Sequence, residues 1–148
     1  MDQPITNSQK HDAYTEQMGR LNRALKSEFY LEAIFIEYAV VEDRIESVLR
    51  HSGKFNPEKH NTLDKKLSKL SEMQRAKNGL VRKYFSDELI RTIYDWKSRR
   101  NPMVHALMKQ QLHTSDLASL AFDGQTLIKT LSVKTRSYNN MIAKQSQK

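Results

Sequence analysis

The chain has 148 residues, which is enough for one domain with a single core. Its four glycines and three prolines are too few for a turn-rich β-sandwich or barrel, and the lack of cysteine excludes disulfide bonds and thiolate zinc sites. Since no apolar run approaches the length of a membrane span and the first residues lack a signal-peptide pattern, we expect a cytoplasmic protein with no membrane contact.

The formal net charge of +8 is distributed unevenly along the chain. Residues 1–64 contain 8 Lys and Arg against 11 Asp and Glu, whereas residues 65–100 contain 11 against 4 and residues 101–148 contain 6 against 2. A basic block of this kind attracts polyanions such as RNA. The same composition is typical of a solvated helix face, and charge alone does not decide between these two interpretations.

The first half of the chain is predicted to be helical. From His11 to about Arg50, apolar residues recur at helical spacing, which predicts two helices or one long bent helix. A basic last turn before Gly53 marks the end of this segment, and residues 53–60 are predicted to form a loop. The first apolar stripe consists of Tyr14, Met18, Leu21, Leu25, Phe29, Ala33, Ile36 and Val40.

The next segment is predicted to contain two further helices with a short one between them. Asn61 or Thr62 can cap the helix that carries the leucines at 63, 67 and 70. The pattern breaks at Asn78-Gly79, and residues 80–85 are expected to pack on the core as a short helix. Ser86 and the two acidic residues after it are typical of the start of the following helix.

Asn101-Pro102 predicts a kink or break in that helix. Proline clashes with the carbonyl of Ser98 and biases the residue before it away from the α region. A new helical segment is expected to begin here, with Asn101 as its N-cap and Pro102 in the favoured first position. The last long helix is expected to begin at Ser115 and Asp116.

These patterns together predict an all-α fold. Neither an internal repeat nor an alternating strand pattern is visible. We expect a single domain over residues 1–148, built as an up-and-down bundle of about five helices. Residues 1–10 and 144–148 are expected to be frayed.

The residues that carry chemistry are concentrated at the predicted break. Arg100, Asn101 and His105 form the pattern R-N-x-x-x-H. In an uninterrupted helix Arg100 and His105 would point about 140° apart, because successive residues turn by about 100°. A break would free Arg100 to fold over the new helix start, where unpaired amides favour a phosphate. The sequence therefore predicts an anion site.

This motif in a helical chain of such length resembles the HEPN superfamily, whose ribonucleases carry an R-x4-6-H motif at a helix start. The resemblance covers roughly residues 11–145 but depends mainly on Arg100, Asn101 and His105. It implies a HEPN-like bundle and a metal-independent endoribonuclease in which two motifs meet across a homodimer. It also implies a toxin–antitoxin or phage-defence context. One departure is Leu107, where HEPN toxins paired with a nucleotidyltransferase often have an adenylylated tyrosine.

The residues of the motif are suited to RNA cleavage through the 2′-hydroxyl. We expect this reaction to need no cofactor, and the sequence shows no set of metal ligands. Histidine can act as base or acid near neutral pH, and arginine offers a bidentate fork to phosphate oxygens. Because one chain offers one well-placed imidazole, a two-fold dimer would supply two. We expect Arg100, His105 and Asn101 to be the catalytic residues, and Arg99 and Lys97 to bind RNA.

Other interpretations of the same residues remain open. An arginine and a histidine at a helix break can cap carbonyls or lie in a structural interface. One alternative function is a non-catalytic HEPN-like domain that binds RNA or a protein partner, such as an antitoxin. A second is a helical scaffold whose basic face only confers solubility, which predicts weak and salt-sensitive binding of polyanions.

Overall fold

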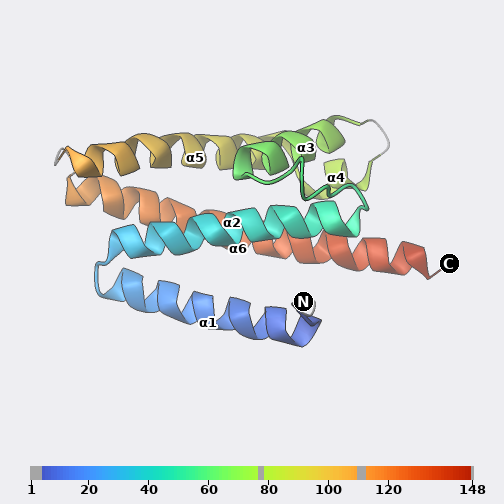
Figure 1. Cartoon of the computed structure of the whole chain (residues 1–148), viewed down its shortest axis with the longest axis horizontal. Helices are drawn as coiled ribbons and strands as arrows, with labels where there is room; N and C mark the ends of the chain where they lie inside the picture. The colour runs from blue at the N-terminus through green and yellow to red at the C-terminus, as the bar shows by residue number, and fades with distance from the viewer. Residues whose placement is uncertain (1–4, 77–78, 110–112, 148) are drawn as a thin grey trace.

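The structure is a computed structural model that describes residues 5–76, 79–109 and 113–147. Over these ranges the chain forms six α-helices and no strand (Figure 1). The predicted all-α bundle is confirmed, with six helices where about five were expected. The helices are α1 (Asn7–Lys26), α2 (Tyr30–His51), α3 (Leu63–Arg75), α4 (Leu80–Tyr84), α5 (Asp87–Met108) and α6 (Thr114–Ser146).

Helices α2 and α6 form the centre of the bundle (Figure 1). Helix α1 packs on α2, α5 packs on α6, and α3 packs on the face of α2 away from α1. The two central helices run in the same direction, because Glu37 of α2 lies against Gly124 of α6 and Ser47 lies against Asn139. Buried aliphatic side chains from all six helices fill the space between them.

The helices do not alternate strictly in direction, which corrects the up-and-down prediction. The connection of residues 52–62 leads the chain back along α2, so that α3 runs in the same direction as α2 and α6 (Figure 1). Helix α3 then lies antiparallel to α5: Gln74 at its end donates to Asp87 at 2.8 Å, and Asp64 at its start pairs with Lys97. A connection of this length permits the return, whereas a short turn would force an antiparallel neighbour.

The segment from His11 to Arg50 forms two helices rather than one bent helix. Helix α1 ends in a Schellman motif, in which the N–H of Phe29 donates to the carbonyl of Ala24 at 2.8 Å. Glu28 adopts the left-handed conformation that this motif requires, with φ of 61°. Because glutamate lacks the conformational freedom of glycine, this turn was not visible as a helix end in the sequence.

The predicted fraying of residues 1–10 is wrong from Asn7 onward, because α1 begins there. Thr6 and Gln9 form a capping box: the Thr6 side chain accepts from the N–H of Gln9 at 3.1 Å, and the Gln9 side chain accepts from the N–H of Thr6 at 2.8 Å. Residues 1–4 lie outside the described part of the chain.

The remaining helix ends agree with the sequence to within a few residues. Thr62 caps α3, and Ser86 caps α5 by accepting from the N–H of Leu89 at 3.1 Å. Helix α6 begins one residue before the predicted start and continues to Ser146, so the predicted fraying of residues 144–148 is wrong for 144–146. Among the described residues, none of the helices combines the length and apolar composition needed to cross a membrane.

Candidate functional site

Helix α5 is continuous through the predicted break, and this decides the geometry of the motif. It runs from Asp87 to Met108 with Pro102 inside it, so Asn101 is a helical residue and not an N-cap. The predicted start of a new helix at Asn101-Pro102 is therefore wrong. Pro102 removes one N–H donor from the helix, but the packing of buried Trp96 before it and of Met103 after it holds both halves against the bundle.

Arg100 and His105 consequently lie on different sides of one helix. Five helical positions correspond to about 140° of rotation, so a single subunit does not direct both side chains at one phosphate. His105 is exposed in the last turn of α5. Asn101 is exposed as well, and its side-chain oxygen accepts a long hydrogen bond of 3.4 Å from Arg100 Nη1.

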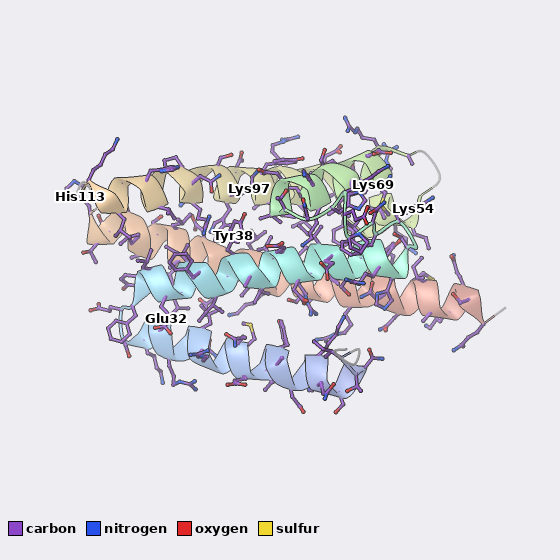
Figure 2. The ribbon with its side chains drawn as sticks, viewed as in Figure 1. Glu32, Tyr38, Lys54, Lys69, Lys97 and His113 are labelled. Atoms are coloured by element: carbon purple, nitrogen blue, oxygen red, sulfur yellow. The ribbon has the colours of Figure 1, made fainter. Side chains whose placement is uncertain are left out.

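Arg100 points towards α2, where aromatic rings hold its guanidinium. The guanidinium carbon lies 4.0 Å from the ring centroid of Tyr38 and 5.6 Å from that of Phe35. Figure 2 shows Tyr38 in the space between α2 and α5. The Nε atom of Arg100 is buried and has no hydrogen-bond partner among the described residues. The contact is therefore of the cation–π kind, which fixes the arginine without neutralising its charge.

Arg99 and Lys97, the predicted RNA-binding residues, point away from Arg100 and form ion pairs. Arg99 points towards α6, where its Nη1 lies 2.8 Å from a carboxylate oxygen of Asp123. Lys97 lies beside the first turn of α3, where it pairs with Asp64 (Figure 2). The basic residues that are adjacent in sequence thus diverge towards three different helices, because each residue turns about 100° from the last.

A groove of about 510 Å³ runs between α5 and α6 beside this region. Asp95, Arg99, Asp123 and Lys134 contribute charges of both signs to its lining, and Trp96 forms part of its wall. The indole N–H of Trp96 donates to the carbonyl of Leu120 at 3.0 Å, which fixes the ring against α6. With Glu88, the lining carries three carboxylates against two basic side chains, so the groove does not favour an anion.

Glu37 is a buried acidic residue behind this groove that the sequence analysis did not single out. Its side chain is fully buried, and neither carboxyl oxygen has a hydrogen-bond partner among the described residues. Burial, with a smaller contribution from the negative charge of Asp123, raises the pKa of Glu37 to about 9, so the group is neutral at pH 7. Gly124 provides the space: a Cβ there would lie 2.2 Å from Glu37 Oε1.

The sequence did contain a signal for Glu37. It follows the apolar run Ala33-Ile34-Phe35-Ile36 and lies three residues after Ile34 and four before Val41, both of which are buried. A charged residue in the middle of a buried stripe indicates either a partner or a shifted pKa. Gly124, whose small size makes room for the carboxyl, gave no such signal.

No group of three or more His, Cys, Asp or Glu side chains is placed to hold a metal ion in the described ranges. No protein-family model, curated protein or solved structure matches the chain. The resemblance to HEPN ribonucleases therefore stays a prediction from the motif formed by Arg100, Asn101 and His105.

Proposed function

We propose that the chain is one subunit of a dimeric, metal-independent endoribonuclease. The observation that carries this proposal is the state of Arg100, which aromatic rings hold in place and which has no carboxylate partner in the described part of the chain. The neighbouring cations Lys97 and Arg99 are both neutralised by carboxylates. A positioned, uncompensated guanidinium is suited to bind the oxygens of a phosphodiester.

The proposed reaction is attack of a ribose 2′-hydroxyl on the adjacent phosphorus. A histidine takes the proton of the 2′-hydroxyl, the bond from phosphorus to the 5′-oxygen breaks, and an acid returns a proton to that oxygen. The products are a 2′,3′-cyclic phosphate and a 5′-hydroxyl. Arg100 stabilises the charge that develops on the phosphate, and His105 is the residue for proton transfer.

A second subunit is needed because α5 is unbroken. In one subunit Arg100 and His105 diverge, whereas two α5 helices related by a two-fold axis can bring one motif against the other and supply two imidazoles. Exposed apolar side chains near both residues support self-association at this end of the bundle. Phe35 is 48% exposed beside Arg100, and Leu107 is 40% exposed two residues after His105.

In this proposal Asn101 positions Arg100, and Arg99 is a better candidate than Lys97 for binding RNA. Asn101 accepts a hydrogen bond from Arg100 and orients its guanidinium. The Arg99 side chain is 43% exposed, so it can exchange Asp123 for an RNA phosphate. The Lys97 side chain is only 12% exposed and is held against Asp64, which makes it the weaker candidate for RNA binding.

The resemblance also supports a biological context for this activity. A cytoplasmic HEPN ribonuclease acting in a toxin–antitoxin or phage-defence system would have RNA as its substrate and an antitoxin or other protein as a further partner. Leu107 is inconsistent with control by adenylylation of a tyrosine at that position. Control by direct binding of an antitoxin is the form of regulation that we propose.

A non-catalytic domain that binds RNA or a protein is the second candidate. The continuity of α5 favours it, since the arginine and histidine are not brought together in one subunit. This candidate predicts RNA binding that survives the substitution His105→Ala, with no cleavage by any form of the protein.

The test is cleavage of a structured RNA pool by purified protein in EDTA, with His105→Ala, Arg100→Ala and the control Arg91→Ala. Arg91 is an exposed arginine on the same helix, with no ion pair to a described carboxylate. We expect the first two variants to lose about 100-fold or more of the activity and Arg91→Ala to retain it. Cleavage must leave 2′,3′-cyclic phosphate ends. Equal inactivity of the folded wild type and all variants would overturn the ribonuclease proposal.

A further inference from the structure

A second groove lies on the other side of the bundle, between α1, the second half of α2 and α6. Its volume is about 610 Å³, within the range of small-molecule sites in proteins. Figure 1 shows the N-terminal half of α1 diverging from α2, and it is here that the groove opens. None of its lining residues belongs to α5, so this groove is separate from Arg100 and His105.

The groove is lined by cationic and imidazole side chains from three helices, and its lining includes no carboxylate; Asp43, which pairs with Arg44, is not among the lining residues. Residues 1–64 carry more acidic than basic residues, so this local excess of basic groups is produced by the fold and not by the composition of the segment. The side chains are Lys10, His11, Arg44, His51 and Arg136.

Two of these side chains are held in position by the protein. The guanidinium carbon of Arg44 lies 4.8 Å from the ring centroid of Tyr14, and its Nε and Nη2 atoms donate to Asp43, so Nη1 is left for a ligand. The Nδ1 atom of His51 donates to the carbonyl of Ser47 at 2.8 Å, because a carbonyl can only accept. The Nε2 atom of His51 is therefore the ring nitrogen left for a ligand.

The floor of the groove is polar although it lies over the centre of the bundle. Ser132 of α6 is buried and shares a hydrogen bond of 3.0 Å with the hydroxyl of Tyr14, and Ser47 accepts from Asn139 at 3.0 Å. The side-chain oxygen of Asn139 is buried with no partner among the described residues. The buried residues earlier in α6 have no polar side chain: they are Leu120, Ala121, Gly124, Leu127, Ile128 and Leu131. Burying polar groups is costly, so a polar floor favours a wet groove with a polar ligand.

We propose that this groove binds the phosphate groups of a nucleotide, either free or within an RNA strand. Arg44, Arg136 and Lys10 bind phosphate oxygens, and His51 donates or accepts through Nε2. The amides of Asn7 and Asn22, which also line the groove, combine a donor and an acceptor in the geometry that recognises the edge of a nucleobase. This site does not depend on the ribonuclease proposal, because it shares no residue with it.

The test is a calorimetric titration of the full chain with three probes: inorganic pyrophosphate, ADP and a short oligoadenylate RNA. The test variant is Lys10→Gln/Arg136→Gln, in which both residues are exposed and neither forms an ion pair with a described carboxylate. The matched control is Arg91→Gln/Lys129→Gln, which removes two exposed charges outside the groove. Circular dichroism verifies that both variants are folded.

We expect ADP or the oligonucleotide to bind the wild type and the control, and to bind Lys10→Gln/Arg136→Gln about tenfold or more weakly. Binding of ADP would identify a free nucleotide as ligand, and binding of the oligonucleotide alone would identify RNA. The imidazole NMR signals of His11 and His51 should shift on binding, while those of His60 and His113 should not. Equal weakening in both double variants, or no binding of any probe at millimolar concentration, would overturn the proposal.

Discussion

Arg100 and Glu37 illustrate two ways in which a buried or half-buried ionisable residue is accommodated. The rings of Tyr38 and Phe35 contact the guanidinium of Arg100 and offer its charge a favourable face. Glu37 lies in a fully buried position without a hydrogen-bond donor from the described residues, and it loses its charge by binding a proton. The difference is chemical, since an arginine cannot be neutralised in a protein whereas a carboxyl can.

The raised pKa of Glu37 predicts a specific dependence of stability on pH. Below pH 4.5 the group is protonated in both folded and unfolded chains. Between pH 4.5 and about 9 the unfolded chain loses this proton while the folded chain retains it, so stability falls as pH rises, by at most about 1.4 kcal/mol per pH unit. In Glu37→Gln the side chain keeps the shape of a protonated glutamate but has no group that titrates. We therefore expect the difference in free energy of unfolding, Glu37→Gln minus wild type, to increase by at least about 1 kcal/mol between pH 5 and pH 7.

The measurement is urea denaturation of both proteins at several pH values. Glu42→Gln is a suitable control, since Glu42 is half-buried on the same helix but paired with Lys66. It should show no comparable gain at the higher pH. A constant difference between Glu37→Gln and wild type from pH 5 to pH 7 would mean that Glu37 is ionised in the folded protein.

At the scale of the element, α5 shows how packing overrides a local helix breaker. A proline inside a helix costs about 3 kcal/mol relative to alanine. Trp96 is 2% exposed and lies less than two turns before Pro102, and Met103 packs on the core directly after it. These contacts hold the helix in one piece through a residue that would end it in isolation. The helix that carries the motif is therefore a single element at the cost of some stability.

Pro102→Ala is expected to stabilise the protein by about 1–3 kcal/mol, because it restores a backbone donor and removes the clash with the preceding turn. Thermal and urea unfolding measure this change. Pro57 lies in the turn after α2, so Pro57→Ala should be neutral or destabilising by up to about 1 kcal/mol. A loss of stability in Pro102→Ala would indicate that the proline ring makes a contact that the helix needs.

At the scale of the whole molecule, the bundle joins segments that are distant in sequence. Helix α6 contacts α2, α4 and α5, and Tyr14 of α1 reaches across to Ser132 of α6. Trp96, the single tryptophan, is buried where α5 meets α6 and lies 6.4 Å from the ring of Tyr38 on α2. Its fluorescence therefore reports on the contact of three helices, whereas circular dichroism reports on all of them.

We expect one cooperative unfolding transition, as predicted for a single domain over residues 1–148. The urea midpoint from tryptophan fluorescence should coincide with the midpoint from circular dichroism. Helix α1 has long-range contacts chiefly with α2, so it is the element that would separate first if the bundle were not one unit. Loss of part of the helical signal before the fluorescence change would show that α1 unfolds independently.

The sequence by itself determined the features that depend on a few neighbouring residues. The all-α fold follows from apolar spacing, and the helix starts at Thr62 and Ser86 follow from side chains that bond amides three residues away. The same local reasoning was wrong at Asn101-Pro102, and it gave no signal for the helix end at Glu28. Pro102 lies inside a continuous helix, and Glu28 adopts the left-handed conformation. Packing offsets the cost of the proline, and the hydrogen bonds of the Schellman motif offset the cost of the left-handed conformation, which is about 1–2 kcal/mol.

Only the tertiary structure decided which distant residues meet. The pairing of Arg99 with Asp123, the contact of Glu37 with Gly124 and the basic groove lined by Lys10, Arg44 and Arg136 each join different helices. The relative directions of α2, α3 and α6 determine these contacts, and those directions depend on how the helices bury their apolar faces together. Periodicity reveals which face of a helix is buried, but not which other helix covers it. The motif could therefore be read from the sequence, whereas the divergence of its side chains and the second groove could not.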